Sequence, residues 1–363
     1  MEELYCIGCG SKIQSEDKEQ AGYIPASKLA GDTESIVCHR CFRLRHYNEI
    51  IPSTVTMDDY YDILSSIGKE DALIVKIIDL FDLEGSMMPE LAKLTNQQEL
   101  IVLLNKRDLL PKSINNQKLI HRLLKTFSEN NLKPTKVFIM SAVKKQSIDE
   151  IAHYLEEHQN NRNIYVVGAS NVGKSTFLNA LIKSFTDIKE DVITVSHQAG
   201  TTQNVIEIPF LEKSIIDTPG LINEHQFLAY IDQKAMKIVI PKKEIKPRVF
   251  QLNPEQTLFL GGLVELNYLE GEQNSFACYV NQLLNIHRTK TEKVAELKET
   301  HKDDEFFYPT IKESKLKTLT FRIKGDEELV LPGLGFVSIK HRGKISVTLD
   351  ERITPIVRGK LFG

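Results

Sequence analysis

The sequence predicts an α/β protein whose central domain is a doubly wound, mostly parallel sheet, preceded by a small cysteine-rich segment and followed by a β-rich α+β domain. Three observations support this. Apolar runs alternate with amphipathic helical patterns from residue 71 to 182, which is typical of a parallel sheet covered by helices. Two Cys-x-x-Cys pairs lie near the N-terminus, and short strand patterns dominate near the C-terminus.

The chain of 363 residues is long enough for two or three domains, and its patterns divide it into residues 1–50, 51–222 and 223–363. Hydrophobic content of 41% and charged content of 26% are ordinary for a globular protein, and a net charge of −3 excludes no class of partner. No apolar run has membrane-spanning length, and the N-terminus does not have the pattern of a secretory signal. We therefore expect a cytoplasmic protein, where reducing conditions favour metal binding over disulfides.

The N-terminal segment carries two cysteine pairs with the spacing of a metal site. Each pair can bind a tetrahedral ion from a tight turn, and because thiolates are soft ligands, zinc is the first choice and iron the second. Four protein ligands leave no open coordination position, so the site would be structural. Unrelated buried thiols or a redox-active pair are the alternatives. The predicted ligands are Cys6, Cys9, Cys38 and Cys41.

The second cysteine pair is followed by a run of basic and aromatic residues. Such side chains on a rigid knuckle suit RNA phosphates and exposed bases, and a solvated face explains them equally well. They are His39, Arg40, Phe42, Arg43, Arg45, His46 and Tyr47. The isolated Cys278 is expected to be a buried structural thiol.

Residues 164–176 hold the motif around which the chain is organised. An apolar run enters Gly-Ala-Ser-Asn-Val-Gly-Lys-Ser, which fits G-x-x-x-x-G-K-[ST], and a helical pattern follows. The amides of such a loop surround phosphate oxygens, and the helix start adds a positive dipole. Lys174 is expected to reach the β- and γ-phosphates, and the Ser175 hydroxyl to bind Mg²⁺; a chance glycine-rich turn is the alternative. The predicted nucleotide contacts are Gly168, Asn171, Val172, Gly173, Lys174, Ser175 and Thr176.

Three further apolar strands precede this loop and alternate with helical patterns. The strands are expected at 71–79, 100–104 and 137–140, and the helices at 86–95, 114–129 and 148–158. Ser147 and Glu150 fit a capping box at the start of the last of these helices.

The second of these strands runs into the sequence Asn-Lys-Arg-Asp. Guanine presents two adjacent donors that the carboxylate of Asp108 can accept together, whereas adenine would leave this carboxylate unpaired. Asn105 would brace the loop, and the Lys106 stem would lie along the base. A backbone amide at Ser141 or Ala142, after the third strand, would serve the guanine O6. A solvated loop is the alternative, but the accompanying phosphate loop favours nucleobase recognition.

Two segments after the phosphate loop are expected to respond to the γ-phosphate. A loop threonine can bind Mg²⁺ with its hydroxyl; Thr202 is the first choice and Thr201 the second, with ordinary loop threonines as the alternative. A predicted hairpin over 205–217 ends in Asp-Thr-Pro-Gly. Asp217 would hold Mg²⁺ through water, and the Gly220 amide would contact the γ-phosphate.

The motifs occur in an unusual order, because Asn-Lys-x-Asp and Ser-Ala precede the phosphate loop instead of following Asp-x-x-Gly. In a parallel sheet all these loops gather at the carboxyl ends of the strands, so cutting and rejoining the chain preserves the site. The sequence therefore predicts a circularly permuted P-loop GTPase domain. With its four-cysteine knuckle and its Asp-Leu-Phe-Asp-Leu-Glu-Gly-Ser loop at 79–86, the chain resembles the YqeH-type bacterial GTPases.

The resemblance implies GTP and GDP as ligands, slow intrinsic hydrolysis, binding to ribosomal RNA or the ribosome, and a role in assembling the small (30S) subunit. Leu221 follows Asp-x-x-Gly where Ras-like enzymes place a water-orienting glutamine, which agrees with slow hydrolysis. Related GTPases use a bound K⁺, held partly by an asparagine at the position of Asn171. We expect a monomer with no membrane partner.

The pattern changes at about residue 223, and strands are expected at 258–269, 316–323, 335–340 and 344–349. Basic residues gather near a turn and in the tail, where an RNA-binding face or a solvated edge would explain them. They are Lys340, His341, Arg342, Lys344, Arg352, Arg358 and Lys360. Because Asp-x-x-Gly leads directly into this domain, movement of that segment could reorient it.

Three functions are compatible with these patterns. The first is a slow GTPase that acts as a timer in RNA assembly, binding in the GTP state and leaving after hydrolysis. The second is an RNA-binding scaffold in which the nucleotide mainly stabilises the fold. The third is an enzyme that modifies RNA, for which the sequence offers no second catalytic centre.

Overall fold

The computed structural model describes residues 4–6, 11–18, 20, 22–28, 36–47, 54–55, 57–88, 98–188, 206–302 and 305–361. The chain divides into two compact units. The first comprises Met1–Arg107 and Leu123–Ile222, and the second comprises Asp108–Arg122 and Asn223–Gly363. Among the described residues, no helix combines the length and the apolar character needed to cross a bilayer.

A six-stranded sheet forms the centre of the first unit, in the order β4-β3-β2-β5-β7-β6. Neighbouring strands are parallel except for β6, which joins β7 as an antiparallel hairpin at the edge. β2 is buried along its whole length, as expected for a central strand with both faces covered. The predicted doubly wound sheet is thus confirmed. Its strands are β2 (Ala72–Asp79), β3 (Glu99–Asn105), β4 (Lys136–Ile139), β5 (Asn163–Val167), β6 (Ile206–Phe210) and β7 (Lys213–Asp217).

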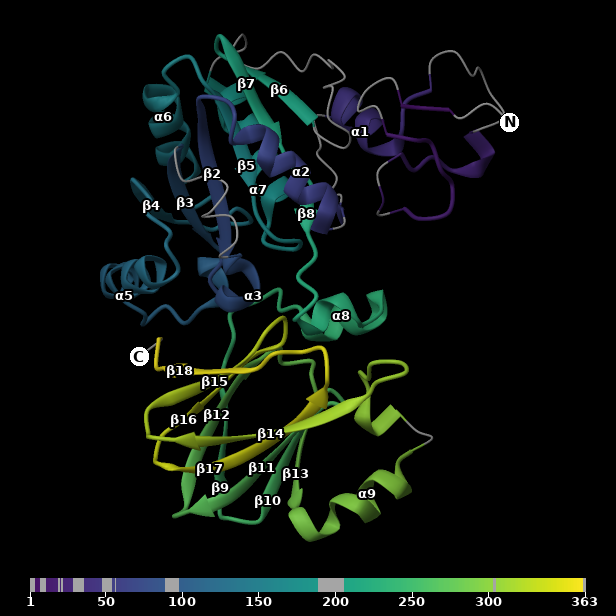
Figure 1. Ribbon diagram of the computed structural model, residues 1–363, viewed down its shortest axis with the longest axis vertical. Coiled ribbons are helices and arrows are strands. Elements are labelled where there is room, and N and C mark those ends of the chain that lie inside the picture. Colours follow the sequence, from purple (N-terminus) through teal and green to yellow (C-terminus); the bar gives the residue numbers. More distant parts are fainter. Residues whose placement is uncertain are drawn as a thin grey trace. The chain divides into compact units, whose positions relative to one another are not determined.

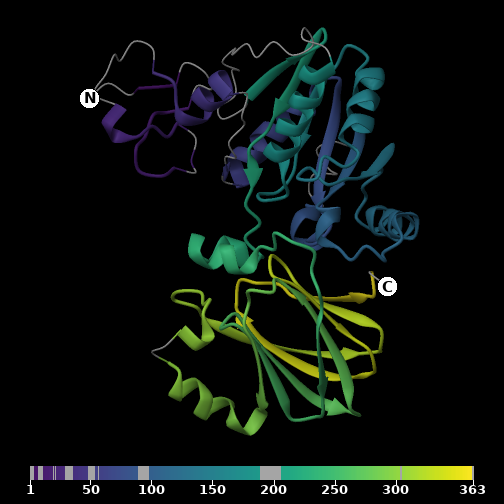
Figure 2. The same ribbon diagram turned by 180° about the vertical axis from the view of Figure 1, so that it is seen from behind.

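Helices flank this sheet, with α2 on one face and α6 and α7 on the other (Figures 1 and 2). The helices of the central region are α2 (Met57–Ile67), α3 (Leu83–Met87), α5 (Asn116–Glu129), α6 (Ile148–His158) and α7 (Lys174–Ile188). The helices predicted at 114–129 and 148–158 are confirmed. For the helix predicted at 86–95, α3 ends at Met87 and most of the remainder lies outside the described residues.

The predicted capping box at Ser147 is wrong. Ser147 has a left-handed backbone, with φ of 60°, and its side chain makes no capping hydrogen bond. A capping serine normally has an extended backbone, which turns its hydroxyl toward the free amides of the first turn. The acidic residues Asp149 and Glu150 in the first turn still favour the helix through its dipole.

The N-terminal segment contains little regular structure in its described part. A 3₁₀ turn, η1 (Ala26–Lys28), and the helix α1 (His39–Tyr47) are its helical elements there. Farther on, the two-residue strand β1 (Thr54–Val55) pairs in parallel with β8 (Gly220–Leu221), the strand that follows Asp217 and Thr218.

The C-terminal part is a sandwich of two five-stranded sheets, ordered β13-β10-β11-β17-β14 and β18-β15-β16-β12-β9. Its strands are β9 (Arg248–Leu252), β10 (Gln256–Leu260), β11 (Val264–Gly271), β12 (Asn274–Val280), β13 (Ile286–Lys290), β14 (Leu316–Ile323), β15 (Glu327–Leu331), β16 (Gly335–Ile339), β17 (Gly343–Asp350) and β18 (Ile356–Gly359). Its helices are η3 (Phe227–Ala229), α8 (Gln233–Val239), η4 (Thr291–Lys293), α9 (Val294–Thr300) and η5 (Glu305–Phe307). The predicted β-rich domain is confirmed.

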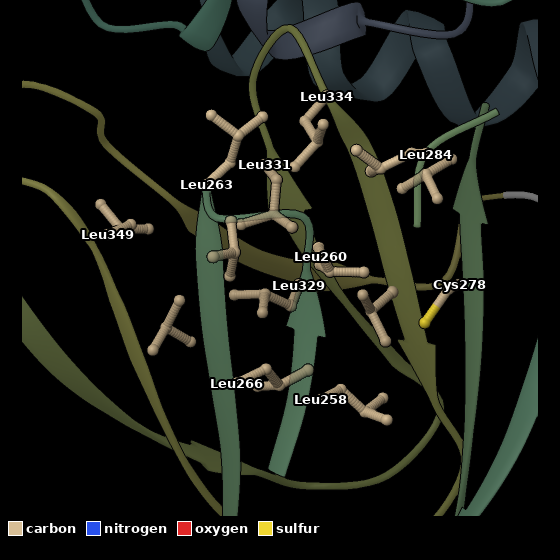
Figure 3. Packing of buried hydrophobic residues seen from close by; sticks show 14 of the residues in the cluster. Leu258, Leu260, Leu263, Leu266, Cys278, Leu284, Leu329, Leu331, Leu334 and Leu349 are labelled. Atoms are coloured by element: carbon tan, nitrogen blue, oxygen red, sulfur yellow. The ribbon is translucent and has the colours of Figure 1, made fainter. Parts of the chain in front are cut away.

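Leucines from both sheets fill the space between them, and the Cys278 sulfur lies among them (Figure 3). Cys278 is completely buried, and burial raises the pKa of its thiol to about 12. It is therefore an inert core residue, as the sequence predicted.

The segment after β8 belongs to this C-terminal core. Phe227, Ala235 and Val239 are buried in the same hydrophobic cluster as the sandwich leucines. Backbone hydrogen bonds reinforce the attachment: the Phe227 amide donates to the Pro332 carbonyl at 3.0 Å, and the Thr354 amide donates to the His225 carbonyl at 3.2 Å. The sandwich core thus begins at Phe227, shortly after Gly220 of Asp-x-x-Gly in the sequence.

Candidate nucleotide site

The phosphate loop connects β5 to α7 as predicted. Gly173 has a φ of 96° and Asn171 a φ of 62°, both in the left-handed region. A Cβ on Gly173 would lie only 2.4 Å from Nδ2 of Asn105, so the loop needs glycine for space as well as for conformation. Val172 is buried, and Thr176 lies in the first turn of α7.

Lys174 folds back onto its own loop. Its Nζ donates to the carbonyls of Gly168 at 2.9 Å and Ala169 at 3.1 Å, and the side chain is almost fully buried. Burial lowers the pKa of this ammonium, Asp217 opposes the fall and Arg40 adds to it, and together they leave the pKa at about 8. Two neutral carbonyls are weak partners for a buried cation, so phosphate oxygens would bind it better.

Asp217 ends β7 beside this lysine and is 1% exposed. Its Oδ2 accepts a hydrogen bond from Arg40 Nη2 at 2.6 Å, while its Oδ1 has no hydrogen-bond partner among the described residues. Burial raises the pKa of this carboxyl, and Arg40 and Lys174 oppose the rise. A carboxylate oxygen without a partner, together with the Ser175 hydroxyl, supplies the hard ligands that Mg²⁺ prefers. The residues present fit a magnesium ion.

Gly220 packs closely against the phosphate loop. A Cβ there would lie 2.9 Å from Ser170 Oγ and 3.0 Å from Lys174 Nζ. The next residue, Leu221, accepts a hydrogen bond from the Ser170 amide at 2.7 Å. The Asp-x-x-Gly segment and the phosphate loop are therefore in direct contact.

Asn105 joins the Asn-Lys-x-Asp loop, which is predicted to recognise the base, to the phosphate loop. Its Nδ2 donates to the Val172 carbonyl at 2.8 Å, and its Oδ1 accepts from the Ala142 amide at 3.0 Å. The bracing role predicted for Asn105 thus has a specific geometry: one amide ties together three loops at the carboxyl edge of the sheet. Because Asn105 uses the Ala142 amide, that amide is not directed at a base; Ser141 is fully buried beside it.

Lys106 is held by a residue that the sequence analysis did not assign to the site. Its Nζ lies 2.6 Å from Oδ2 of Asp79, the last residue of β2. The other oxygen of Asp79 accepts from the Phe81 amide at 2.9 Å, so the carboxylate is itself fixed. The sequence does contain a signal for this pairing: Asp79 ends the strand next to the one that precedes Lys106, and neighbouring parallel strands end at the same edge of the sheet. Asp108 follows in the 3₁₀ turn η2 (Arg107–Leu109).

Three predicted site residues lie outside the described part of the chain. They are Cys9, Thr201 and Thr202.

Comparisons with known proteins agree with this geometry. Residues 163–258 match the family model "50S ribosome-binding GTPase", and residues 273–361 match "YqeH-like, C-terminal". The protein YqeH of Bacillus subtilis, described as uncharacterized, is 44% identical over 350 residues, covering 95% of each chain. This chain belongs to the YqeH family of GTPases.

More distant relatives of this YqeH-family chain occur in eukaryotes. The Arabidopsis thaliana "NO-associated protein 1, chloroplastic/mitochondrial" is 26% identical, covering 79% of this chain and 58% of its own length. The solved structure of YjeQ from Thermotoga maritima is 22% identical, with a TM-score of 0.28 over 41% of this chain and 48% of that chain, a similarity too low to support an inference.

The N-terminal cysteines of this YqeH-family GTPase converge as the spacing predicts. The Sγ atoms of Cys6, Cys38 and Cys41 lie within 4.8 Å of one another and are buried. The Cys38 amide donates to Cys6 Sγ at 3.2 Å, a bond that a thiolate ligand accepts readily. The donor set and its clustering fit zinc, which would crosslink this segment in place of a larger hydrophobic core.

Arg40, between two of these cysteines, is not available to RNA. It is 5% exposed and ion-paired with Asp217, so the expectation that it forms part of an RNA-binding or solvated face is wrong. The ring of His39 packs edge-on against Tyr23. A residue that the sequence pattern placed on a basic surface is therefore paired with Asp217 of the candidate nucleotide site.

Several basic residues of the C-terminal sandwich are neutralised within it. Arg358 pairs with the buried Glu328 at 2.9 Å, Arg352 with Asp350 at 2.7 Å, and Lys344 with Glu270 at 2.6 Å. Two turns, one from β14 to β15 and one from β16 to β17, each connect the two sheets and carry exposed basic side chains; the Asp326 amide joins them by donating to the Lys340 carbonyl at 3.0 Å. We call this group the basic tip; it consists of Arg322, Lys324, Lys340, His341 and Arg342.

Proposed function

We propose that this protein is a slow, cytoplasmic GTPase that binds ribosomal RNA in its GTP state and leaves after hydrolysis, as an assembly factor for the small ribosomal subunit. The observation that carries the proposal is the continuity between Asp-x-x-Gly and the sandwich. Phe227 and Ala235 are core residues of the C-terminal domain. A shift of Gly220 toward a γ-phosphate would therefore pull on a packed element, which can transmit movement.

The phosphate chemistry is assigned to the motif residues, of which Lys174 and Gly220 pack closely against each other. Lys174 would release the carbonyls of its loop and bind the β- and γ-phosphates, while Ser175, Asp217 and Thr202 would hold Mg²⁺. Asp108 would select guanine. We assign residues 1–50 to a zinc domain, 51–222 to the GTPase domain and 223–363 to the RNA-binding domain, in a chain that acts as a monomer.

The residue after Asp-x-x-Gly supports the proposal that hydrolysis is slow. Leu221 is apolar and buried, and its backbone is tied into β8, so it cannot orient an attacking water. We propose that K⁺ assists instead, with Asn171 as one ligand. Equal turnover in Na⁺ and K⁺ buffers would rule this out.

The basic tip is the proposed RNA-binding face, because its charges are exposed whereas Lys344, Arg352 and Arg358 are paired with carboxylates. Reversing two charges, Lys340→Glu with Arg342→Glu, should weaken RNA binding by about tenfold or more at low salt and reduce the salt dependence. The matched control, Lys293→Glu with Lys302→Glu, changes net charge equally just before and just after α9. Equal loss in both double variants would point to net charge alone.

Co-sedimentation with isolated ribosomal subunits tests the whole proposal. The protein is mixed with small or large subunits in the presence of a GTP analogue or GDP. Binding to the small subunit in the analogue state alone supports the assembly timer. Binding to the large subunit, the one named in the matched family description, would redirect the proposal to that particle.

The scaffold alternative makes a different prediction. If nucleotide only stabilises the fold, Lys174→Ala should bind subunits normally provided that the variant remains folded. If the protein is a switch, the same variant should lose the difference between the two nucleotide states. Circular dichroism and zinc content serve as controls for folding.

A further inference from the structure

Arg40 belongs to the N-terminal cysteine-rich residues 1–50, which we call the zinc segment, and contacts the candidate nucleotide site. It is the second residue of α1 and lies between Cys38 and Cys41, two of the clustered cysteines. Its Nη2 is 2.6 Å from Oδ2 of Asp217, and the side chains are 5% and 2% exposed. The two residues are 177 positions apart, so this contact connects the zinc segment with the Asp-x-x-Gly motif.

The contact supplies what a buried carboxylate requires. Asp217 lies in a site that excludes water, and an ionised carboxylate there needs a cation beside it. Arg40 fills this role, with Lys174 as the second nearby charge. A guanidinium is always protonated, so this partner cannot be removed by a change in pH.

Mg²⁺ would require the same carboxylate. Three cations around one carboxylate repel one another strongly in a site of low dielectric. A nucleotide brings negative charge for Lys174 and Mg²⁺, but Arg40 still lies on Oδ2 of the carboxylate whose Oδ1 Mg²⁺ would use, so both cations draw on one negative charge. Either Arg40 moves away, or Mg²⁺ binds less tightly than the site would otherwise allow.

We propose that Arg40 competes with Mg²⁺ for Asp217, so that the zinc segment is docked in the nucleotide-free protein and loosened when magnesium and GTP bind. Zinc bound to Cys38 and Cys41 would fix the backbone on both sides of Arg40 and so keep its side chain beside Asp217. This inference rests on the proposed role of Asp217 as a magnesium-site residue. It assigns the zinc segment to control of the nucleotide site.

The test measures the Mg²⁺ dependence of nucleotide binding in the full chain. Release of a fluorescent GDP is followed while Mg²⁺ is titrated, for wild type, Arg40→Gln, Arg40→Lys and the control Arg43→Gln on the same helix. Arg40→Gln should lower the half-saturating Mg²⁺ concentration about tenfold, within the usual range of coupling between two ligands. Arg40→Lys, which keeps the charge, should have a smaller effect, and Arg43→Gln none.

Hydrogen exchange on the wild type provides a second readout that needs no variant. Amides of residues 36–47 should exchange faster with Mg²⁺ and a GTP analogue than in the nucleotide-free protein. Unchanged exchange together with unchanged Mg²⁺ dependence in Arg40→Gln would overturn the proposal. Weaker Mg²⁺ or nucleotide binding in Arg40→Gln would also overturn it, because Arg40 would then be a phosphate ligand.

The variant Asp217→Asn tests separately whether Asp217 belongs to the magnesium site, on which the proposal for Arg40 rests. If Asp217 serves Mg²⁺, this variant should need much more Mg²⁺ to retain the nucleotide. If its Mg²⁺ dependence is that of wild type, the magnesium assignment fails and the proposal for Arg40 fails with it. Zinc content near one ion per chain confirms in each variant that the N-terminal segment has remained intact.

Discussion

Replacing Asn105 with alanine tests the bond that joins the base-recognition loop to the phosphate loop. Asn105 is 3% exposed, and both ends of its amide are used, at 2.8 Å to the Val172 carbonyl and 3.0 Å to the Ala142 amide. Each neutral hydrogen bond contributes about 1 kcal/mol net, and each buried partner left without a bond costs about 1–3 kcal/mol. Asn105→Ala should therefore cost ~2–4 kcal/mol.

This cost should appear in nucleotide binding, because the lost bonds hold the loops in their binding arrangement. Since 1.4 kcal/mol is a factor of ten, GDP should bind roughly 30- to 700-fold more weakly. The assay is titration with a fluorescent GDP, with thermal unfolding of the nucleotide-free protein measured in parallel.

Asn274 provides a matched control in the sandwich. It is completely buried, and its side chain makes two hydrogen bonds with the backbone of His341, both at 2.9 Å. Asn274→Ala should lower stability by a similar amount and leave the GDP affinity unchanged. If both variants bind GDP as wild type does, Asn105 is an ordinary core amide and the bracing argument is wrong.

Three further predictions follow. Asp108→Asn should shift preference from guanine toward xanthine nucleotides, because an amide presents a donor, and competition binding would reveal unchanged guanine preference if the assignment is wrong. Asp79→Asn should weaken GDP binding by up to about fivefold, since the ion pair it removes from Lys106 is partly exposed, and a wild-type affinity would argue against a positioning role. Arg352 holds the pKa of Asp350 at about 2, below its ordinary 3.8, so Asp350 stabilises the fold above pH 3.8 and this contribution is lost as pH falls toward 2. Asp350→Asn should therefore be destabilised in urea at pH 7, and the difference from wild type should shrink below pH 3.8; a pH-independent difference would contradict this.

The sequence alone determined the order of strands and helices in the central domain. Continuous apolar runs such as Ala72–Asp79 are long enough for a strand and have no polar face, so they fit only the middle of a covered sheet. The phosphate loop could also be predicted from the sequence. Positions such as Gly173 need a left-handed backbone and a close approach of Asn105, and glycine alone allows both. The two Cys-x-x-Cys pairs predicted that their thiols would lie together, because the geometry of a metal ion limits the spacing of its ligands.

Only the tertiary structure decided which charges are available and which are paired. Arg40 and Arg358 belong to basic stretches in the sequence, yet Arg40 meets Asp217 and Arg358 meets Glu328. These partners come from distant strands, and a sequence pattern does not report which side chains packing brings within a few ångströms. The pairing of Lys106 with Asp79 arises in the same way, from parallel strands that end at one edge. Local geometry is encoded by neighbouring residues, whereas the electrostatics of the site depend on the burial of groups that meet only in the folded chain.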